Sequence, residues 1–251
     1  MNRSKSLIPV VIALAFQCLV GLTPELRAQD NDPFAASRNH MIRLIEADVR
    51  ETSRYLKRTE LTDAVLRAMG EVPRHEFVPA HLSDRAYQNR PLPIGYGQTI
   101  SQPYIVAIMS DLLDIKPGYK ALEVGTGSGY QAAVLAALEA RVWSIEIIEP
   151  LGDEARERLH RLGLGQIQLR IGDGYYGWPE QAPFDAIVVT AAASHIPPPL
   201  VQQLKVGGKM IIPVGSRFSI QELILITRIN ADEIVTRQVL PVRFVPLTGG
   251  H

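Results

Sequence analysis

The fold is decided by the stretch Leu122-Glu123-Val124-Gly125-Thr126-Gly127-Ser128-Gly129-Tyr130, which reads as a buried strand entering a helix through a loop with glycine at every second position. Glycine allows positive φ and lets a ligand lie against bare main chain, which a Cβ would obstruct. A dinucleotide-binding loop needs its third glycine three residues after the second, but Tyr130 stands there and Gly129 comes one residue early. The loop therefore predicts a nucleoside site that differs from an NAD or FAD site.

A carboxylate precedes this loop, since Glu123 stands at the end of the expected strand. A negative charge there would repel a pyrophosphate but suits a ligand that carries positive charge. S-adenosylmethionine is a nucleoside with a positively charged sulfonium, and it meets both conditions. We therefore expect S-adenosylmethionine as the cofactor.

Strands and helices alternate from Tyr119 onward, which predicts an α/β fold with a doubly wound, mostly parallel, Rossmann-like sheet. The continuous apolar run 186–189 is typical of a central strand and the alternating stretch 167–171 of an edge strand, so the glycine loop is expected mid-sheet. Ligands bind such sheets at the carboxyl ends of the strands. The expected strands are 120–124, 141–146, 167–171, 185–190 and 209–214, the best helix is 150–162, and 221–229 with 234–240 form a C-terminal antiparallel hairpin.

The region before the sheet is expected to be helical with one long loop. After a polar linker over 30–37, apolar spacing predicts a helix over 41–56. Thr62 could cap a second helix that runs to Met69 and stops at Gly70. Residues 91–103 are rich in Pro and Gly and predict a long ordered loop before a helix that begins at Pro103.

Residues 1–28 resemble a secretory signal peptide. Arg3 and Lys5 precede an apolar run over 7–16, and Leu26-Arg27-Ala28 offers a cleavage site. The apolar run is too short to span a bilayer. This segment favours export and is left out of the expected fold, with a linker and N-terminal helix over 29–60 and one large domain over 61–251.

Composition narrows the function further. The chain has 251 residues, and Lys plus Arg balance Asp plus Glu at 26 each, so no long-range field favours nucleic acid or stable association with an anionic membrane. Cys18 is the only cysteine, which excludes intrachain disulfides, and the six histidines lack paired ligand spacing, so no metal site is expected. With no excess charge and no second domain, a monomer is the default expectation.

Two further acids close strands at the same sheet edge. Glu146 could accept both ribose hydroxyls of a nucleoside, and Asp173 in Gly172-Asp173-Gly174 could accept from the adenine amino group. A solvated strand end and a turn residue between glycines remain the alternatives. Together with Glu123 and the glycines, they form the pattern of a class I S-adenosylmethionine-dependent methyltransferase. The expected cofactor-binding residues are Glu123, Gly125, Thr126, Gly127, Ser128, Gly129, Glu146, Asp173 and Gly174.

The residues at the end of the fourth expected strand restrict the choice of methyl acceptor. Methyltransferases that act on adenine amino groups carry Asn or Asp, two prolines and an aromatic there, whereas this chain reads Thr190-Ala191-Ala192-Ala193. Without a polar clamp for an exocyclic amine, nucleic-acid N-methylation loses its main support.

Several blocks over 61–247 resemble the protein-L-isoaspartate (D-aspartate) O-methyltransferase family. The most specific is Gln98-Thr99-Ile100-Ser101-Gln102-Pro103, and further blocks are Leu92-Pro93-Ile94-Gly95, Pro183-Phe184-Asp185, Ile212-Pro213-Val214-Gly215 and Arg243-Phe244-Val245-Pro246-Leu247. The resemblance implies methyl transfer from S-adenosylmethionine to the α-carboxylate of L-isoaspartyl and D-aspartyl residues in damaged proteins. Such a carboxylate has a pKa near ~4, so it attacks without a general base.

The resemblance implies that Ser101 is the active-site serine, and we interpret its hydroxyl as a donor that orients the acceptor carboxylate. The alternative is that Ser101 caps the helix entering at Pro103. Substrate contacts are expected from Thr99, Ile100 and Gln102. The stretch 242–247, with Val245, Pro246 and Leu247, either pairs with the substrate backbone or forms an ordinary buried strand.

Two rival functions and one conflict over location remain at this stage. In the first rival function, an enzyme with the same fold methylates the carboxylate or hydroxyl of a small molecule. In the second, an exported protein has kept the fold as a binding module and has no catalytic activity. Family habit and cofactor supply favour the cytoplasm, whereas the signal-like segment favours the periplasm or secretion.

Overall fold

The computed structural model describes residues 32–216 and 219–250 of the chain. The account below concerns the compact unit that begins at Ala36 and contains the whole of the expected sheet. The signal-like segment over 1–28 lies outside the described residues.

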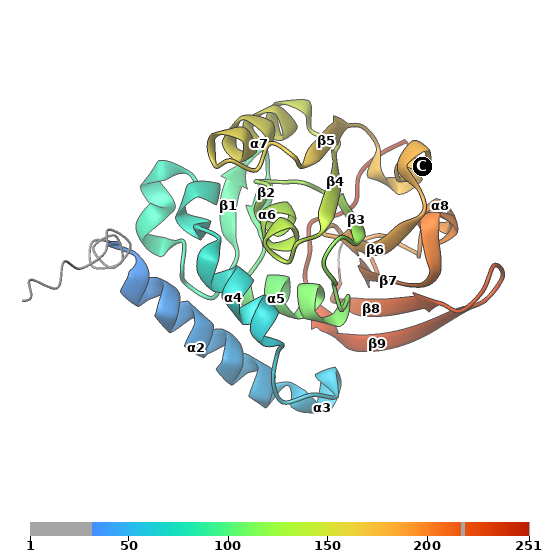
Figure 1. The fold of residues 1–251 in the computed structure, drawn as a ribbon, viewed down its shortest axis with the longest axis horizontal. Coiled ribbons are helices and arrows are strands. Elements are labelled where there is room, and N and C mark those ends of the chain that lie inside the picture. The colour runs from blue at the N-terminus through green and yellow to red at the C-terminus, as the bar shows by residue number, and fades with distance from the viewer. Residues whose placement is uncertain (1–31, 217–218, 251) are drawn as a thin grey trace, which may run out of the picture. The chain divides into compact units, whose positions relative to one another are not determined.

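Within the described residues, seven strands form one sheet in the order β5-β4-β3-β6-β7-β8-β9 (Figure 1). Neighbours from β5 to β7 are parallel, and β8 and β9 extend the same sheet as an antiparallel hairpin. This confirms the predicted fold class, with β5 at the edge and β3 in the interior. The strands are β3 Lys120–Val124, β4 Arg141–Glu146, β5 Gln168–Ile171, β6 Phe184–Val189, β7 Leu204–Val214, β8 Gln221–Arg228 and β9 Ile234–Val242.

The interior position of β6 follows from its composition. Ala186 to Val189 are all at most 1% exposed, so both faces of this strand are covered, as expected for a parallel sheet. Leu122 and Val124 on β3 and Phe184 on β6 are buried in the same apolar core.

Helices pack against the sheet and against one another. Helix α6 contacts β3 and β4, α7 contacts β4 and β5, and α8 contacts β7, while α4, α5 and α6 pack together. In Figure 1, α2 runs along the outer side of α4 and α5. The helices are α2 Ala35–Glu51, α3 Ser53–Leu56, α4 Asp63–Glu71, α5 Pro103–Leu112, α6 Tyr130–Ala137, α7 Glu149–Arg161 and α8 Pro198–Gln203, with short 3-10 turns η1 Arg74–Phe77, η2 Ala80–Arg85, η3 Gly174–Tyr176 and η4 Pro179–Gln181.

Two predicted helix ends are wrong. Helix α2 begins at Ala35, within the stretch expected as a polar linker. Helix α4 passes through Gly70 and ends at Glu71, because Val72 precedes a proline and takes the extended conformation that such residues favour. Thr62 is the N-cap of α4 but makes no side-chain cap bond; its hydroxyl donates to Asp111 Oδ1 at 3.0 Å.

The predicted long loop over 91–103 is also wrong. Strands β1 Leu92–Gly95 and β2 Gln98–Ile100 form a two-stranded antiparallel hairpin. Its turn is possible because Gly95, Tyr96 and Gly97 all have positive φ. The hairpin delivers the chain to Ser101 and the start of α5, so it positions a segment of the expected site.

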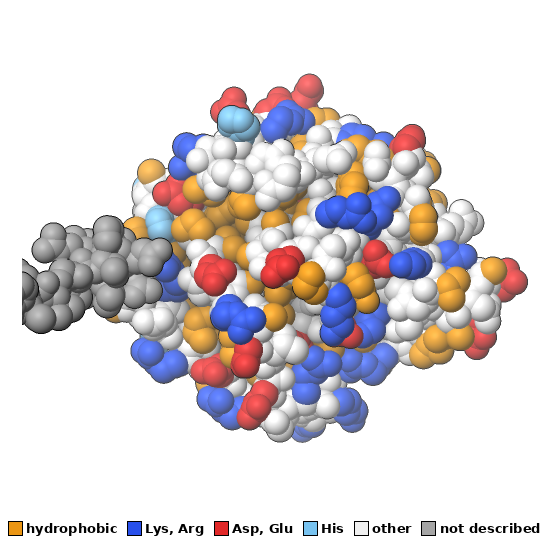
Figure 2. Space-filling model, in the orientation of Figure 1, with side chains coloured by type: hydrophobic (Ala, Val, Ile, Leu, Met, Phe, Trp, Pro, Cys, Tyr) orange, Lys and Arg blue, Asp and Glu red, His pale blue; other side chains and the backbone are white. Residues whose placement is uncertain are grey.

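The surface shows mixed charge. Acidic and basic side chains are interspersed over the face in Figure 2. Across the residues that the structure describes, none of the helices combines the length and apolar character that a membrane crossing requires.

Candidate active site

The glycine loop connects β3 to α6, as predicted, and Thr190 at the end of β6 packs against it. Gly125 has φ +93°, and a Cβ on it would lie 2.5 Å from Thr190 Oγ1. The Thr190 hydroxyl donates to the Gly125 carbonyl at 2.6 Å. Glycine is therefore required at position 125 both by its backbone conformation and by this close approach.

Glu123 is a fully buried acid at the end of β3. It accepts a hydrogen bond from Ser144 Oγ on β4, and Ser144 Oγ lies 2.6 Å from Thr126 Oγ1 in the glycine loop. The other carboxyl oxygen, Oε1, has no hydrogen-bond partner within bonding distance among the described residues, although the backbone amide of Ala132 is near enough to lower the pKa of this acid slightly. Burial raises the pKa of Glu123 to about 8, and the nearby Glu146 adds to this, although the bond from Ser144 opposes it. A cation at this carboxyl would relieve the cost of ionising it.

Glu146, at the end of β4, is buried and holds two backbone amides. Its Oε2 accepts from Gly127 N at 2.8 Å and its Oε1 from Ile148 N at 3.0 Å. A carboxylate has about four acceptor positions, so capacity remains for two more donors. This arrangement suits the ribose hydroxyls that the sequence predicted as its partners.

Asp173 lies beside the cavity but is not among the side chains that line it. It is the N-cap of η3, with Oδ1 accepting from Tyr175 N, and its Oδ2 accepts from Gly250 N, both at 3.0 Å. The turn role weighed as an alternative for Asp173 is thus present in the structure. The contact with Gly250 has no signal in the local sequence. Gly174, the next residue, does line the cavity.

Ser101 lies between β2 and α5, at the mouth of the same cavity. The N-cap of α5 is Gln102, and Pro103 occupies the first turn, so Ser101 is not the cap residue of this helix. The Ser101 carbonyl accepts a hydrogen bond from the buried Arg74 at 2.7 Å.

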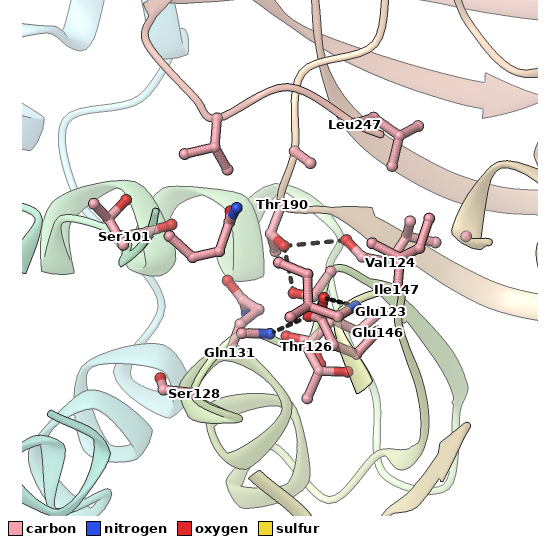
Figure 3. A pocket seen from close by; sticks show the side chains of 18 of the residues that line it. Ser101, Glu123, Val124, Thr126, Ser128, Gln131, Glu146, Ile147, Thr190 and Leu247 are labelled. Carbon is pink, nitrogen blue, oxygen red and sulfur yellow. Dashed lines mark hydrogen bonds between the residues drawn. The ribbon is translucent and has the colours of Figure 1, made fainter. Parts of the chain in front are cut away.

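Most of the predicted residues meet around one cavity. In Figure 3, Glu123, Thr126 and Glu146 lie together at the strand ends, with Ser101 to one side and Leu247 to the other. Of the predicted set, Gly129, Gln102 and Asp173 do not line it. The predicted residues that do are Thr99, Ile100, Ser101, Glu123, Gly125, Thr126, Gly127, Ser128, Glu146, Gly174, Val245, Pro246 and Leu247.

A second cavity adjoins the first and shares Thr99, Ser101, Thr190 and Val245 with it. Gln102 lines this second cavity, together with the stretch 240–244. The shared residues place Ser101 at the junction of the two spaces.

The segment after β9 is extended but only partly matches either predicted alternative. Val245 O accepts from Ala192 N, and Leu247 N donates to Ala192 O, both at 2.8 Å. The segment therefore pairs with residue 192 of its own chain, outside the named strands. Val245 and Leu247 are half-buried and Pro246 is exposed, so this is not a buried strand.

The sequence interpretation missed three polar residues of the cavity region. Ser144 connects Glu123 to Thr126 through hydrogen bonds. Thr190 donates to the Gly125 carbonyl. Gln131, in the first turn of α6, donates to Ser110 Oγ at a distance of 2.9 Å. A signal for Ser144 was present, because a hydroxyl in the otherwise apolar run 142–145 is unexpected unless it has a buried partner.

Comparison with known proteins decides the family. The family model described as protein-L-isoaspartate(D-aspartate) O-methyltransferase matches residues 49–251. The chain belongs to this family. A protein-L-isoaspartate O-methyltransferase 2 of Polaromonas sp. is 62% identical over 209 residues, which cover 83% of this chain and 99% of that relative. A protein-L-isoaspartate O-methyltransferase 1 of Cupriavidus necator is 54% identical over 253 residues, which cover 100% of this chain and 95% of the relative.

A solved structure agrees with this assignment to the isoaspartate methyltransferase family. It is the Plasmodium falciparum member in complex with S-adenosyl-L-homocysteine, with a TM-score of 0.65 and 28% identity, and the match covers 81% of this chain and 97% of that one. In the present chain, the glycine loop fits a nucleoside of this kind, and the unpartnered Glu123 oxygen suits the positive charge that S-adenosylmethionine carries in addition.

Proposed function

We propose that this protein transfers a methyl group from S-adenosylmethionine to the α-carboxylate of L-isoaspartyl and D-aspartyl residues in damaged proteins. The observation that carries the proposal is the family match, which spans 49–251 and therefore includes both the glycine loop and the segment around Ser101. S-adenosylmethionine is the cofactor, as family membership implies. When bound, it supplies an electrophilic methyl group on a sulfonium.

The residues at the ends of β3 and β4 hold the cofactor in this proposal. Glu123 presents its unpartnered carboxyl oxygen to the positive charge, and the glycine loop offers main chain without side chains. Glu146 uses its remaining acceptor positions for the ribose hydroxyls, while Asp173 and Gly174 border the place of the base. The cavity that Glu123, Glu146 and Gly174 line, with Asp173 beside it, supports a single nucleoside site.

Ser101 acts on the acceptor side. Its hydroxyl donates a hydrogen bond to the acceptor carboxylate and turns one oxygen toward the methyl group. The carboxylate is already ionised near neutral pH, so no proton has to be removed. Rate enhancement then comes from alignment and exclusion of water, and such positioning can supply roughly 7 to 11 kcal/mol.

The second cavity is the proposed place of the substrate chain. Thr99, Gln102 and Val245 line it, and it opens beside Ser101, so an extended peptide can lie there with its isoaspartyl carboxylate at the junction. Ile100, Pro246 and Leu247 complete the acceptor side of the first cavity. A cavity of about 570 Å³ beside Ser101 has room for a stretch of peptide, which is more than a small acid needs.

We further propose that the protein is a monomer and that it works in the cytoplasm, where S-adenosylmethionine is made. The alternative is export directed by residues 1–28. N-terminal sequencing of the mature protein from separated cell fractions decides between them: an intact Met1 in the cytoplasmic fraction supports the proposal, and a chain that begins near Gln29 in another compartment contradicts it.

The activity is tested with radiolabelled S-adenosylmethionine and two peptides that differ only in having isoaspartate or aspartate at one position. We expect a base-labile methyl ester on the isoaspartyl peptide alone. Faster methylation of small carboxylic acids would favour the small-molecule rival. Cofactor binding in calorimetry without turnover on either peptide would favour the binding module.

A further inference from the structure

Arg74, in the η1 turn, is fully buried beside the proposed acceptor site. Its Nε donates to the Ala86 carbonyl at 2.8 Å, and its Nη2 donates to the Ser101 carbonyl at 2.7 Å. Both acceptors are neutral. Among the described residues, the guanidinium forms no ion pair with a carboxylate, and burial lowers the pKa of Arg74.

A buried cation without a counter-ion is costly for the folded state. Desolvation of the guanidinium is only partly offset by two hydrogen bonds and by the Tyr130 ring, whose centroid lies 4.7 Å from the guanidinium carbon. Apolar side chains of similar volume often replace buried charges at no cost in stability. Stability alone therefore does not account for an arginine at this position.

Besides Ala86, Arg74 contacts one residue from each half of the proposed reaction. Ser101 stands on the acceptor side, and Tyr130 is the first residue of α6, directly after the glycine loop. Both residues line the first cavity. One rigid, planar side chain thus connects the backbone of the acceptor segment to the start of the helix on the cofactor side.

We propose that Arg74 is a positioning residue, which fixes the Ser101 segment relative to α6 so that acceptor carboxylate and methyl group are aligned. This inference rests on the proposed function and on the role of Ser101 in it. Arg74 acts through the Ser101 carbonyl and does not itself contact substrate. Its loss should therefore lower the rate of transfer and leave cofactor binding nearly unchanged.

The main test compares wild type with Arg74→Met, which keeps an unbranched apolar stem and removes the guanidinium with its charge and donors. We expect kcat on an isoaspartyl peptide to fall at least about tenfold, since a misplacement of ~1 Å can cost two orders of magnitude. S-adenosylhomocysteine affinity should change less than about threefold. The unfolding temperature should change little, because removal of a desolvated charge offsets the loss of the donors to the Ala86 and Ser101 carbonyls.

A matched control replaces another arginine that donates hydrogen bonds to backbone carbonyls but lines neither cavity. Arg228 donates to the carbonyls of Gln202 and Leu204 at 2.9 and 2.6 Å. Arg228→Met should leave kcat unchanged even if it lowers stability. A kcat for Arg74→Met within about twofold of wild type would overturn the proposal.

A double-mutant cycle tests whether the effect passes through Ser101. In a Ser101→Ala background, Arg74→Met should have little further effect on kcat, because the hydroxyl it positions is gone. Independent, multiplying effects of the two substitutions would contradict action through Ser101. If Arg74→Met does not fold, Arg74→Gln takes its place under the same criteria, and unfolding of both would overturn the proposal in favour of a structural role.

Hydrogen exchange measures the positioning without turnover. We expect the amides over 98–104 to exchange faster in Arg74→Met, while those of β8 and β9 remain unchanged. Unaltered exchange over 98–104 would count against Arg74. A wild-type protein that does not methylate isoaspartyl peptides would instead contradict the proposed function, and exchange would still test Arg74.

Discussion

Gly127 N donates to Glu146 Oε2 at 2.8 Å, so the acid at the end of β4 holds the middle of the glycine loop. One carboxylate thereby shapes the loop and keeps acceptor positions for a ligand. The geometry of the loop and the affinity of the site consequently depend on the same side chain.

Replacement of Glu146 by Gln tests this double role. The amide has one accepting oxygen instead of two and carries no charge, and hydrogen bonds to a charged group contribute about 1.5–3 kcal/mol each. We expect S-adenosylhomocysteine to bind roughly 10- to 100-fold more weakly in calorimetry. Glu157→Gln, on the exposed face of α7, is the control and should bind as wild type does.

The raised pKa of Glu123 predicts a pH-dependent stability of the cofactor-free protein. The folded protein keeps the proton up to about pH 8, whereas an unperturbed glutamate releases it near 4.5. The unfolded chain therefore binds fewer protons between these values, and the free energy of unfolding falls as pH rises, by up to about 1 kcal/mol per unit.

Glu123→Gln should remove this part of the slope. Denaturant unfolding at pH values of about 5.5 and 7.5 measures it, and the variant should lose less stability over that interval than wild type does. Cofactor affinity should rise with pH in wild type, because a cation favours the ionised carboxyl. A variant with the slope and the affinity profile of wild type would contradict the assignment of this charge to Glu123.

Gly125→Ala should damage the loop. The new Cβ would lie 2.5 Å from Thr190 Oγ1, in a backbone conformation with φ +93°. The left-handed conformation alone costs an L-residue roughly 1–2 kcal/mol, and the displaced hydroxyl would release the Gly125 carbonyl. We expect a lower unfolding temperature and loss of cofactor binding, whereas Gly163→Ala, with φ +74° but open space, should affect stability alone.

Ser101→Ala tests the acceptor side. Loss of one oriented donor should lower kcat on an isoaspartyl peptide by about one to two orders of magnitude, with cofactor affinity nearly intact. Steady-state kinetics combined with calorimetry separates the two effects. Ser83→Ala, whose hydroxyl bonds the Ala80 carbonyl in η2 away from both cavities, is the control for loss of a hydroxyl. An unchanged rate for Ser101→Ala would leave this serine without a role in transfer.

The centre of the sheet could be predicted from sequence because its signals are local. The bounds of β3 and β4 agree with the prediction, since continuous apolar runs end at acids and a glycine loop. The edge position of β5 and the interior position of β6 followed from comparing their apolar runs. The same locality explains why most of the predicted cofactor-binding residues line one cavity.

The features that could not be predicted depend on contacts between residues that are distant in sequence. The sequence predicts Thr62 as a helix cap, but in the folded chain its hydroxyl donates to Asp111, which is distant in sequence. The hairpin of β1 and β2 was not predicted, because its many prolines and glycines are typical of a loop. Nothing in the local sequence marks Arg74 as buried, and only the folded chain shows it packed against Ser101 and Tyr130.

The bond between Gly250 N and Asp173 Oδ2 has a practical consequence for binding measurements. Because Gly250 is held beside the acid expected to recognise the adenine, bulky groups attached close to Gly250 would crowd that corner. Recombinant protein intended for calorimetry should therefore carry its purification tag elsewhere.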